Sequence, residues 1–128
     1  MEAHWLAKIP LISVVDDDDS VRESVRGLLR SARFGVEAFA SAEEFLSSHS
    51  MGATDCLVLD VRMPGMSGLE LQHRLMASHP AIPIVFITSH GDDELRSRAL
   101  RAGAVDYLLK PFGEEALLNA VQRALSPE

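Results

Sequence analysis

The hydrophobic positions of this 128-residue chain follow two alternating patterns. Short, nearly continuous apolar runs are separated by longer stretches in which apolar residues recur at helical spacing. The runs expected to form strands are 11–15, 36–39, 56–59, 84–87 and 105–109. Because apolar strands that alternate with amphipathic helices are typical of a parallel sheet covered on both faces, the pattern predicts a single α/β domain.

Capping residues and glycines mark the intervening helices. The first helix is expected to begin near Asp19 or Ser20 and to be ended by Gly35. Residues 41–44 (Ser-Ala-Glu-Glu) have a capping-box pattern, which predicts a second helix there. A helix near 92–101 has only a thin apolar stripe, so we expect it to be weakly anchored.

Charge and cysteine content exclude several classes of protein. The chain has 19 acidic and 12 basic residues, a net charge of -7, so direct binding of nucleic acid is not expected. The single cysteine, Cys56, excludes an intramolecular disulfide, and its place in an apolar run predicts a buried, unreactive thiol. No apolar run reaches the roughly 20 residues of a membrane span, and no signal peptide is visible. We therefore expect a cytoplasmic protein without membrane contact.

Residues that carry chemistry lie at the predicted strand ends. Asp16 and Asp17 follow the first run, Asp60 the third, Thr88 the fourth and Lys110 the fifth. Since the carboxyl ends of parallel strands meet at one edge, these side chains are expected to lie together. Two carboxylates 4 Å apart repel by roughly 4 kcal/mol at an effective dielectric near 20, so this edge needs cations, for which Mg²⁺ and the lysine are the candidates. Such an edge suits a carboxylate that accepts a phosphoryl group.

Each of these residues also has a simpler interpretation. The acidic run 16–19 can be a solvated helix N-terminus, Thr88 can close a turn, and Lys110 can extend its ammonium into solvent. Gly-rich nucleotide-binding motifs are absent from the sequence, so a dinucleotide or P-loop site is not supported.

Four segments together resemble the receiver domain of response regulators, the phospho-accepting half of two-component signalling. They occur in the order and spacing of that family: Val14–Asp17, Leu59–Gly68, Ile87–Ser89 and Gly103–Phe112. The likeness is greatest to the FixJ-type subgroup. It covers residues 11–125 and leaves 1–10 as an N-terminal extension and 126–128 as a tail or the start of a linker. The resemblance implies a flavodoxin-like, doubly wound (βα)5 fold, whose five-stranded parallel sheet has the order 2-1-3-4-5 and helices on both faces.

The resemblance also implies a role for each acid. Asp60 is expected to be the phosphoryl acceptor, and Asp16 and Asp17 are expected to bind Mg²⁺ together with Asp60 and the backbone carbonyl of Arg62. In this scheme the phosphoryl group comes from a phosphohistidine on a sensor histidine kinase. The domain is not an enzyme in its own right, but it assists its own phosphorylation and dephosphorylation.

The remaining implied roles concern switching. Lys110 is expected to pair with a phosphoryl oxygen, Thr88 to turn its hydroxyl toward another, and Tyr107 to follow it inward. The Lys110–Pro111 peptide bond is expected to be cis. The altered surface, made by the fourth helix, fifth strand and fifth helix, is expected to control transcription through an output domain or partner outside this chain. Phosphorylation is also expected to allow a receiver homodimer.

Two other functions fit the same predicted fold. A magnesium-dependent phosphohydrolase also has an aspartate nucleophile at a strand end, but it usually carries a second acid two residues later, where this chain has Arg62. An interaction module that is never phosphorylated is the other alternative. Mg²⁺-dependent labelling by acetyl phosphate distinguishes this module from a working receiver.

Overall fold

Strands and helices alternate along the chain in the computed structural model, which describes residues 9–89 and 91–126. The strands are β1 (Leu11–Val15), β2 (Gly35–Phe39), β3 (Cys56–Asp60), β4 (Ile84–Thr88) and β5 (Asp106–Leu109). The helices are α1 (Asp19–Ser31), α2 (Ala42–Leu46), the short 3₁₀ helix η2 (Met51–Ala53), α3 (Gly68–Ser78), α4 (Asp93–Arg101) and α5 (Glu114–Leu125). Of the two terminal segments predicted from the sequence, most of 1–10 and all of 127–128 lie outside the described residues.

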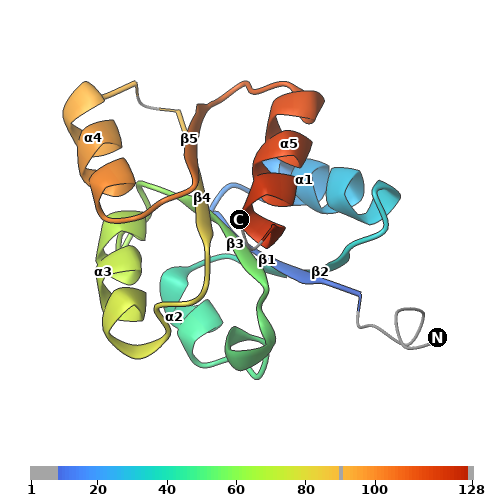
Figure 1. Cartoon of the computed structure of the whole chain (residues 1–128), viewed down its shortest axis with the longest axis horizontal. Coiled ribbons are helices and arrows are strands. Elements are labelled where there is room, and N and C mark those ends of the chain that lie inside the picture. Colours follow the sequence, from blue (N-terminus) through green and yellow to red (C-terminus); the bar gives the residue numbers. More distant parts are fainter. Residues whose placement is uncertain (1–8, 90, 127–128) are drawn as a thin grey trace.

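The five strands form one parallel sheet in the order β2-β1-β3-β4-β5. Helices α1 and α5 cover one face, and α2, α3 and α4 cover the other, which gives three layers (Figure 1). This arrangement confirms the predicted fold class and strand order. The chain leaves β1 for one edge of the sheet and returns beside it as β3, so the strand order reverses between β1 and β3. In open α/β sheets, sites form at the carboxyl ends of the strands at this point.

Two apolar layers hold the helices to the sheet. All residues of β3 and β4 are buried, as expected for central parallel strands. On the α1 and α5 side, the buried set includes Val25 and Leu29 of α1 and Leu117 and Val121 of α5. On the opposite side, Ala99 is the buried residue of α4. The weak anchoring predicted for this helix is therefore present in the structure.

The ends of α1 differ from the sequence-based expectation. Asp18, not Asp19 or Ser20, is the N-cap, and its carboxylate accepts hydrogen bonds from the backbone N–H groups of Ser20 and Val21. At the other end the helix stops at Ser31, well before Gly35, which is already in β2. The prediction that Gly35 ends the helix is therefore wrong.

A Schellman-type turn ends α1. The N–H of Phe34 donates to the carbonyl of Leu29 at 3.1 Å, and the N–H of Arg33 donates to the carbonyl of Arg30 at 2.9 Å. Arg33 has the left-handed φ of 75° that this turn requires and that glycine usually supplies. Phe34, the next residue, packs against the core. This packing holds Arg33 in a conformation that is strained for a residue other than glycine.

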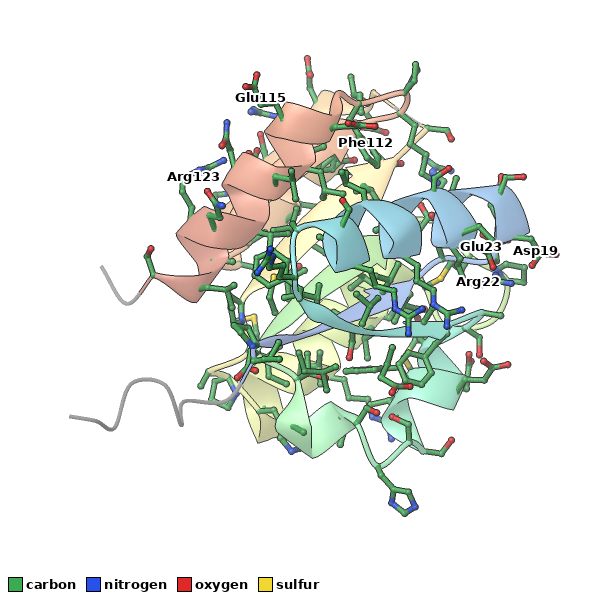
Figure 2. The ribbon with its side chains drawn as sticks, turned by 90° about the vertical axis from the view of Figure 1, so that its right-hand side faces the viewer. Asp19, Arg22, Glu23, Phe112, Glu115 and Arg123 are labelled. Atoms are coloured by element: carbon green, nitrogen blue, oxygen red, sulfur yellow. The ribbon has the colours of Figure 1, made fainter. Side chains whose placement is uncertain are left out.

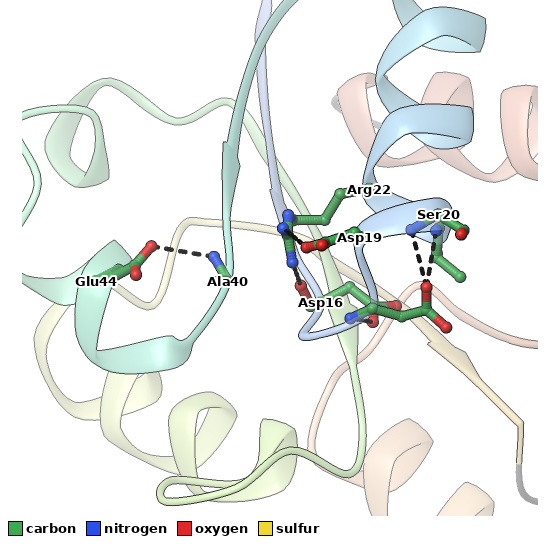
Figure 3. Close-up of polar contacts among 8 residues, drawn as sticks. Asp16, Asp19, Ser20, Arg22, Ala40 and Glu44 are labelled. Carbon is green, nitrogen blue, oxygen red and sulfur yellow. Dashed lines mark hydrogen bonds and ion pairs between the residues drawn. The ribbon is translucent and has the colours of Figure 1, made fainter.

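The start of α2 follows the predicted capping pattern in part. The hydroxyl of Ser41 accepts a hydrogen bond from the N–H of Glu44 at 3.1 Å. The carboxylate of Glu44 reaches back to the N–H of Ala40, one residue beyond the position that a capping box uses (Figure 3). The carboxylate of the adjacent Glu43 instead accepts a hydrogen bond from the backbone N–H of Met66.

The single cysteine lies in the apolar core. Cys56 is buried in β3, and burial, followed by the charge of Asp55, raises the pKa of its thiol to about 12. The thiol is therefore protonated at neutral pH and unreactive, as predicted. Within the described chain, every helix is too short or too polar to cross a bilayer.

We predict that Arg33→Gly raises the free energy of unfolding by about 0.5–1 kcal/mol, because glycine adopts the left-handed conformation without the clash of a Cβ atom. Urea denaturation measures this gain. Arg33→Ala removes the same charge but keeps the Cβ, so it should give no comparable gain. Equal stabilisation by both variants would show that charge, not backbone strain, is responsible.

Candidate functional site

Three aspartates meet where β1 and β3 end. Asp16 follows β1 directly, Asp17 is the next residue, and Asp60 is the last residue of β3. One carboxylate oxygen from each lies within 4.8 Å of the others. Asp16 is fully buried and Asp60 is about 5% exposed, whereas Asp17 is exposed to solvent. The structure thus brings together the three acids that the sequence analysis expected to find at one edge.

The β1–α1 loop holds Asp16 through both its backbone and its side chain. Its N–H donates to the carbonyl of Phe39 at 3.1 Å, and its Oδ1 accepts from the N–H of Asp18 at 2.9 Å. Its carbonyl accepts from Nη1 of Arg22 at 2.8 Å, and the same guanidinium pairs with Asp19 (Figure 3). The sequence analysis did not identify Arg22. Its position six residues after Asp16, in the first turns of α1, is the feature of the sequence that could have indicated this contact.

Lys110 provides the positive charge at this edge. Its Nζ lies 2.8 Å from Oδ2 of Asp16 and 3.8 Å from Oδ2 of Asp60. Its backbone N–H donates to the carbonyl of Thr88 at 2.7 Å, which extends the β4–β5 pairing to the lysine. The Lys110–Pro111 peptide bond is cis, as predicted.

The charges at the site do not balance. Burial, as the largest cause, together with the carboxylates of Asp16 and Asp17 raises the pKa of Asp60 to about 7. The ammonium of Lys110 and a backbone hydrogen bond from Arg62 act in the opposite direction without cancelling these effects. Three carboxylates beside one ammonium leave an excess of negative charge, which a divalent cation would offset.

The β3–α3 loop is fitted closely to the end of β3. The N–H of Gly68 donates to the carbonyl of Val61 at 2.8 Å. A Cβ atom on Gly68 would lie 2.1 Å from the backbone oxygen of Asp60, so no larger residue fits without displacing the strand end. The glycine therefore allows α3 to begin directly against the residue that carries the central carboxylate.

A cleft of about 400 Å³ opens over these residues. It is lined by Asp16, Asp17, Asp18, Asp60, Arg62, Ser89 and Lys110. Thr88 and Tyr107, also predicted as site residues, lie outside this lining. Thr88 is fully buried at the end of β4, and Tyr107 is 6% exposed with its ring centroid 6.1 Å from that of Phe86. The tyrosine hydroxyl is buried without a hydrogen-bond partner among the described residues.

Comparison with known proteins agrees with this geometry. The family described as response regulator receiver domain matches residues 12–122. The chain belongs to this family. The receiver domain is 46% identical over 122 residues to the response regulator protein TodT of Pseudomonas putida strain F1, a match that covers 95% of this chain and 54% of TodT. Receiver domains of response regulators are components of two-component systems.

Two further relatives define the subgroup and the fold. The transcriptional regulatory protein FixJ of Bradyrhizobium diazoefficiens is 43% identical over 114 residues, covering 89% of the receiver domain and 56% of FixJ. The solved structure of the response regulator StyR is 55% identical with a TM-score of 0.84, covering 92% of this chain and 60% of that one. FixJ-type relatives are thus confirmed, and the receiver domain spans about half the length of the curated relatives it matches.

We predict that Asp60→Asn stabilises the metal-free receiver domain by about 1–3 kcal/mol at pH 8. The pKa of Asp60 is higher in the folded than in the unfolded state, so wild type loses stability as pH rises from about 4 to about 7, while the variant does not. The advantage of asparagine should therefore grow across this range and level off above it. Urea denaturation in EDTA at several pH values measures the difference, and a destabilised variant at pH 8 would contradict the proposed repulsion.

Lys110→Ala should destabilise the metal-free domain by about 1–3 kcal/mol, because Asp16 is fully buried and loses its closest cation. Mg²⁺ should restore more stability to this variant than to wild type, since it then supplies the missing charge. Thermal melts with and without Mg²⁺ test both effects. Arg123→Ala, which removes an exposed ion pair with Asp106, is the control and should show neither effect.

Proposed function

We propose that Asp60 accepts a phosphoryl group from a phosphohistidine of a sensor histidine kinase, and that this receiver domain thereby switches an output. The observation that carries the proposal is the acid cluster of Asp16, Asp17 and Asp60, of which Asp16 and Asp60 are buried, beside Lys110. Phosphoryl transfer needs positioning and charge neutralisation more than covalent work by the protein, and this edge of the sheet offers both.

The donor set fits Mg²⁺. The three carboxylates offer oxygen atoms within 4.8 Å of one another, and the backbone carbonyl of Arg62 is proposed as a further ligand. When bound, the ion offsets the excess negative charge of the carboxylates and of the phosphoryl oxygens. Because a nearby cation lowers the pKa of a carboxyl group, Asp60 would then be ionised and nucleophilic at neutral pH.

The proposed reaction is an in-line displacement at phosphorus. One carboxylate oxygen of Asp60 forms the new O–P bond while the P–N bond to the kinase histidine breaks, and the electron pair of that bond returns to the imidazole. Lys110 pairs with one phosphoryl oxygen, and Thr88 turns its hydroxyl toward another. Attack by water on the aspartyl phosphate regenerates Asp60 and releases phosphate. The domain thereby assists both its own phosphorylation and its own dephosphorylation.

A hollow beside Lys110 offers the kinase a place to dock. It has a volume of about 530 Å³ and lies between α1 and the segment that joins β5 to α5. Its walls include Val21, Leu28 and Phe112, and Figure 2 looks onto this face of the molecule. An apolar helix of the kinase seated here would hold its phosphohistidine beside the acid cluster.

The proposed switch involves α4 and β5. Helix α4 is held by little apolar contact, and the buried hydroxyl of Tyr107 lacks a partner among the described residues, so both can respond to a change at Thr88. The altered face of α4, β5 and α5 would be read by an output domain or by a second receiver in a homodimer. Because relatives such as FixJ are named as transcriptional regulators, transcription is the output we propose.

Incubation with acetyl phosphate tests the proposal. Intact mass should increase by one phosphoryl group, about 80 Da, in the presence of Mg²⁺ and not in EDTA. Asp60→Asn should abolish the increase because it removes the nucleophile. Asp106→Asn, which changes an aspartate of β5 that pairs with Arg123, is the matched control and should be labelled like wild type.

Other results would favour the alternatives. Labelling that persists in Asp60→Asn would place the acceptor elsewhere. No labelling of wild type under any condition would favour a module that acts without phosphorylation, and multiple turnover of phosphomonoesters would favour a phosphohydrolase.

A further inference from the structure

Helix α2 is linked to the loop that follows Asp60. Oε2 of Glu43, in the first turn of α2, accepts a hydrogen bond from the backbone N–H of Met66 at 3.0 Å. The two residues are 23 positions apart in sequence, so the bond joins separate elements. The side chain of Met66 packs against the apolar cluster that contains Phe45 of α2, which keeps this part of the loop beside the helix.

Gly65, the residue before Met66, also lies close to the carboxylate of Glu43. Gly65 has a φ of +76°, and a Cβ atom built there would lie 2.8 Å from Oε2 of Glu43. The loop backbone therefore turns directly over the carboxylate, and a glycine at the turn makes this approach possible. A side chain at position 65 would have to displace the end of the Glu43 side chain.

The bond from Glu43 is made near the end of the loop, at Met66, the residue before Ser67. At the start, the N–H of Val61 donates to the carbonyl of Ile87 at 3.3 Å. At the end, Ser67 and Glu70 form a capping box that opens α3. Arg62, whose carbonyl is the proposed metal ligand and whose N–H bonds Asp60, lies between the two ends. Glu43 thus adds a hydrogen bond from α2 to the stretch of loop between Arg62 and the capping box.

We propose that Glu43 is a positioning residue that holds the β3–α3 loop in the conformation that binds the metal. It does not reach the acid cluster itself and acts through the backbone between Gly65 and Met66. The inference rests on the proposed function, because the quantity it controls is the affinity of the site for Mg²⁺.

Glu43 could also act through its charge, by stabilising the N-terminus of α2, instead of through its hydrogen bond to Met66. Acidic residues in the first turn of a helix interact favourably with the helix dipole, and both Glu43 and Glu44 are so placed in α2. Glutamine at position 43 removes the charge but keeps an oxygen that accepts the hydrogen bond from Met66. Glu44 has the same charge one residue along, and its carboxylate bonds Ala40 instead of the loop (Figure 3).

The experiment compares wild type, Glu43→Ala, Glu43→Gln and Glu44→Ala by two measurements. Amide hydrogen exchange followed by NMR reports the Met66 N–H without metal, and calorimetry reports the binding of Mg²⁺ alone. Glu43→Ala should speed exchange at Met66 and weaken Mg²⁺ binding, each by about threefold to tenfold, as expected for the loss of one hydrogen bond. Glu43→Gln and Glu44→Ala should both stay within about twofold of wild type.

Each contrary result has a distinct meaning. Equal losses in Glu43→Gln and Glu43→Ala would overturn the positioning role in favour of a charge effect. Unchanged exchange or unchanged Mg²⁺ affinity in Glu43→Ala, with a wild type that binds Mg²⁺, would overturn the positioning role alone. A wild type that binds no Mg²⁺ would overturn the proposed function and the positioning role together.

Discussion

The repulsion among three carboxylates at the carboxyl edge of the sheet is the constraint on which the site depends. Asp16 and Asp60 are buried, so neither has enough water to stabilise its charge, and Lys110 lies closer to Asp16 than to Asp60. The protein therefore folds with one carboxyl whose pKa lies near 7. In the proposed function, a carboxyl group with such a pKa would change its charge readily when a cation binds beside it.

The strands that carry the acids are held firmly, whereas α4 is held weakly. Strands β1 and β3 are paired along most of their length, and Arg22 and Gly68 hold the backbone where each acid leaves its strand. Helix α4, in contrast, buries little apolar surface. In the proposed switch, moving α4 would therefore cost less packing than moving the strands.

Periodicity and the geometry of parallel strands were sufficient for the α/β class and for the acids and the lysine that meet at one edge, whereas the strand order came from the resemblance to receiver domains. The sequence was not sufficient for the end of α1. There the core contact of Phe34 imposes a left-handed Arg33, so tertiary packing overrides the local preference that pointed to Gly35. The contact between Glu43 and the β3–α3 loop was also beyond the sequence, because it depends on how α2 lies against a loop 23 residues away.

Arg22 and Glu43, which the sequence analysis did not identify, make the same kind of contact. Both side chains bond a backbone group of a loop, and such a contact is not visible to a search for clustered chemical groups. Each fixes a loop that follows a strand end, one after β1 and one after β3. Repelling carboxylates would otherwise move these loops apart, and polar contacts from two helices on opposite faces of the sheet oppose that movement (Figure 1). The acids can then stay close enough to share a cation because α1 and α2 hold the chain on both sides of them.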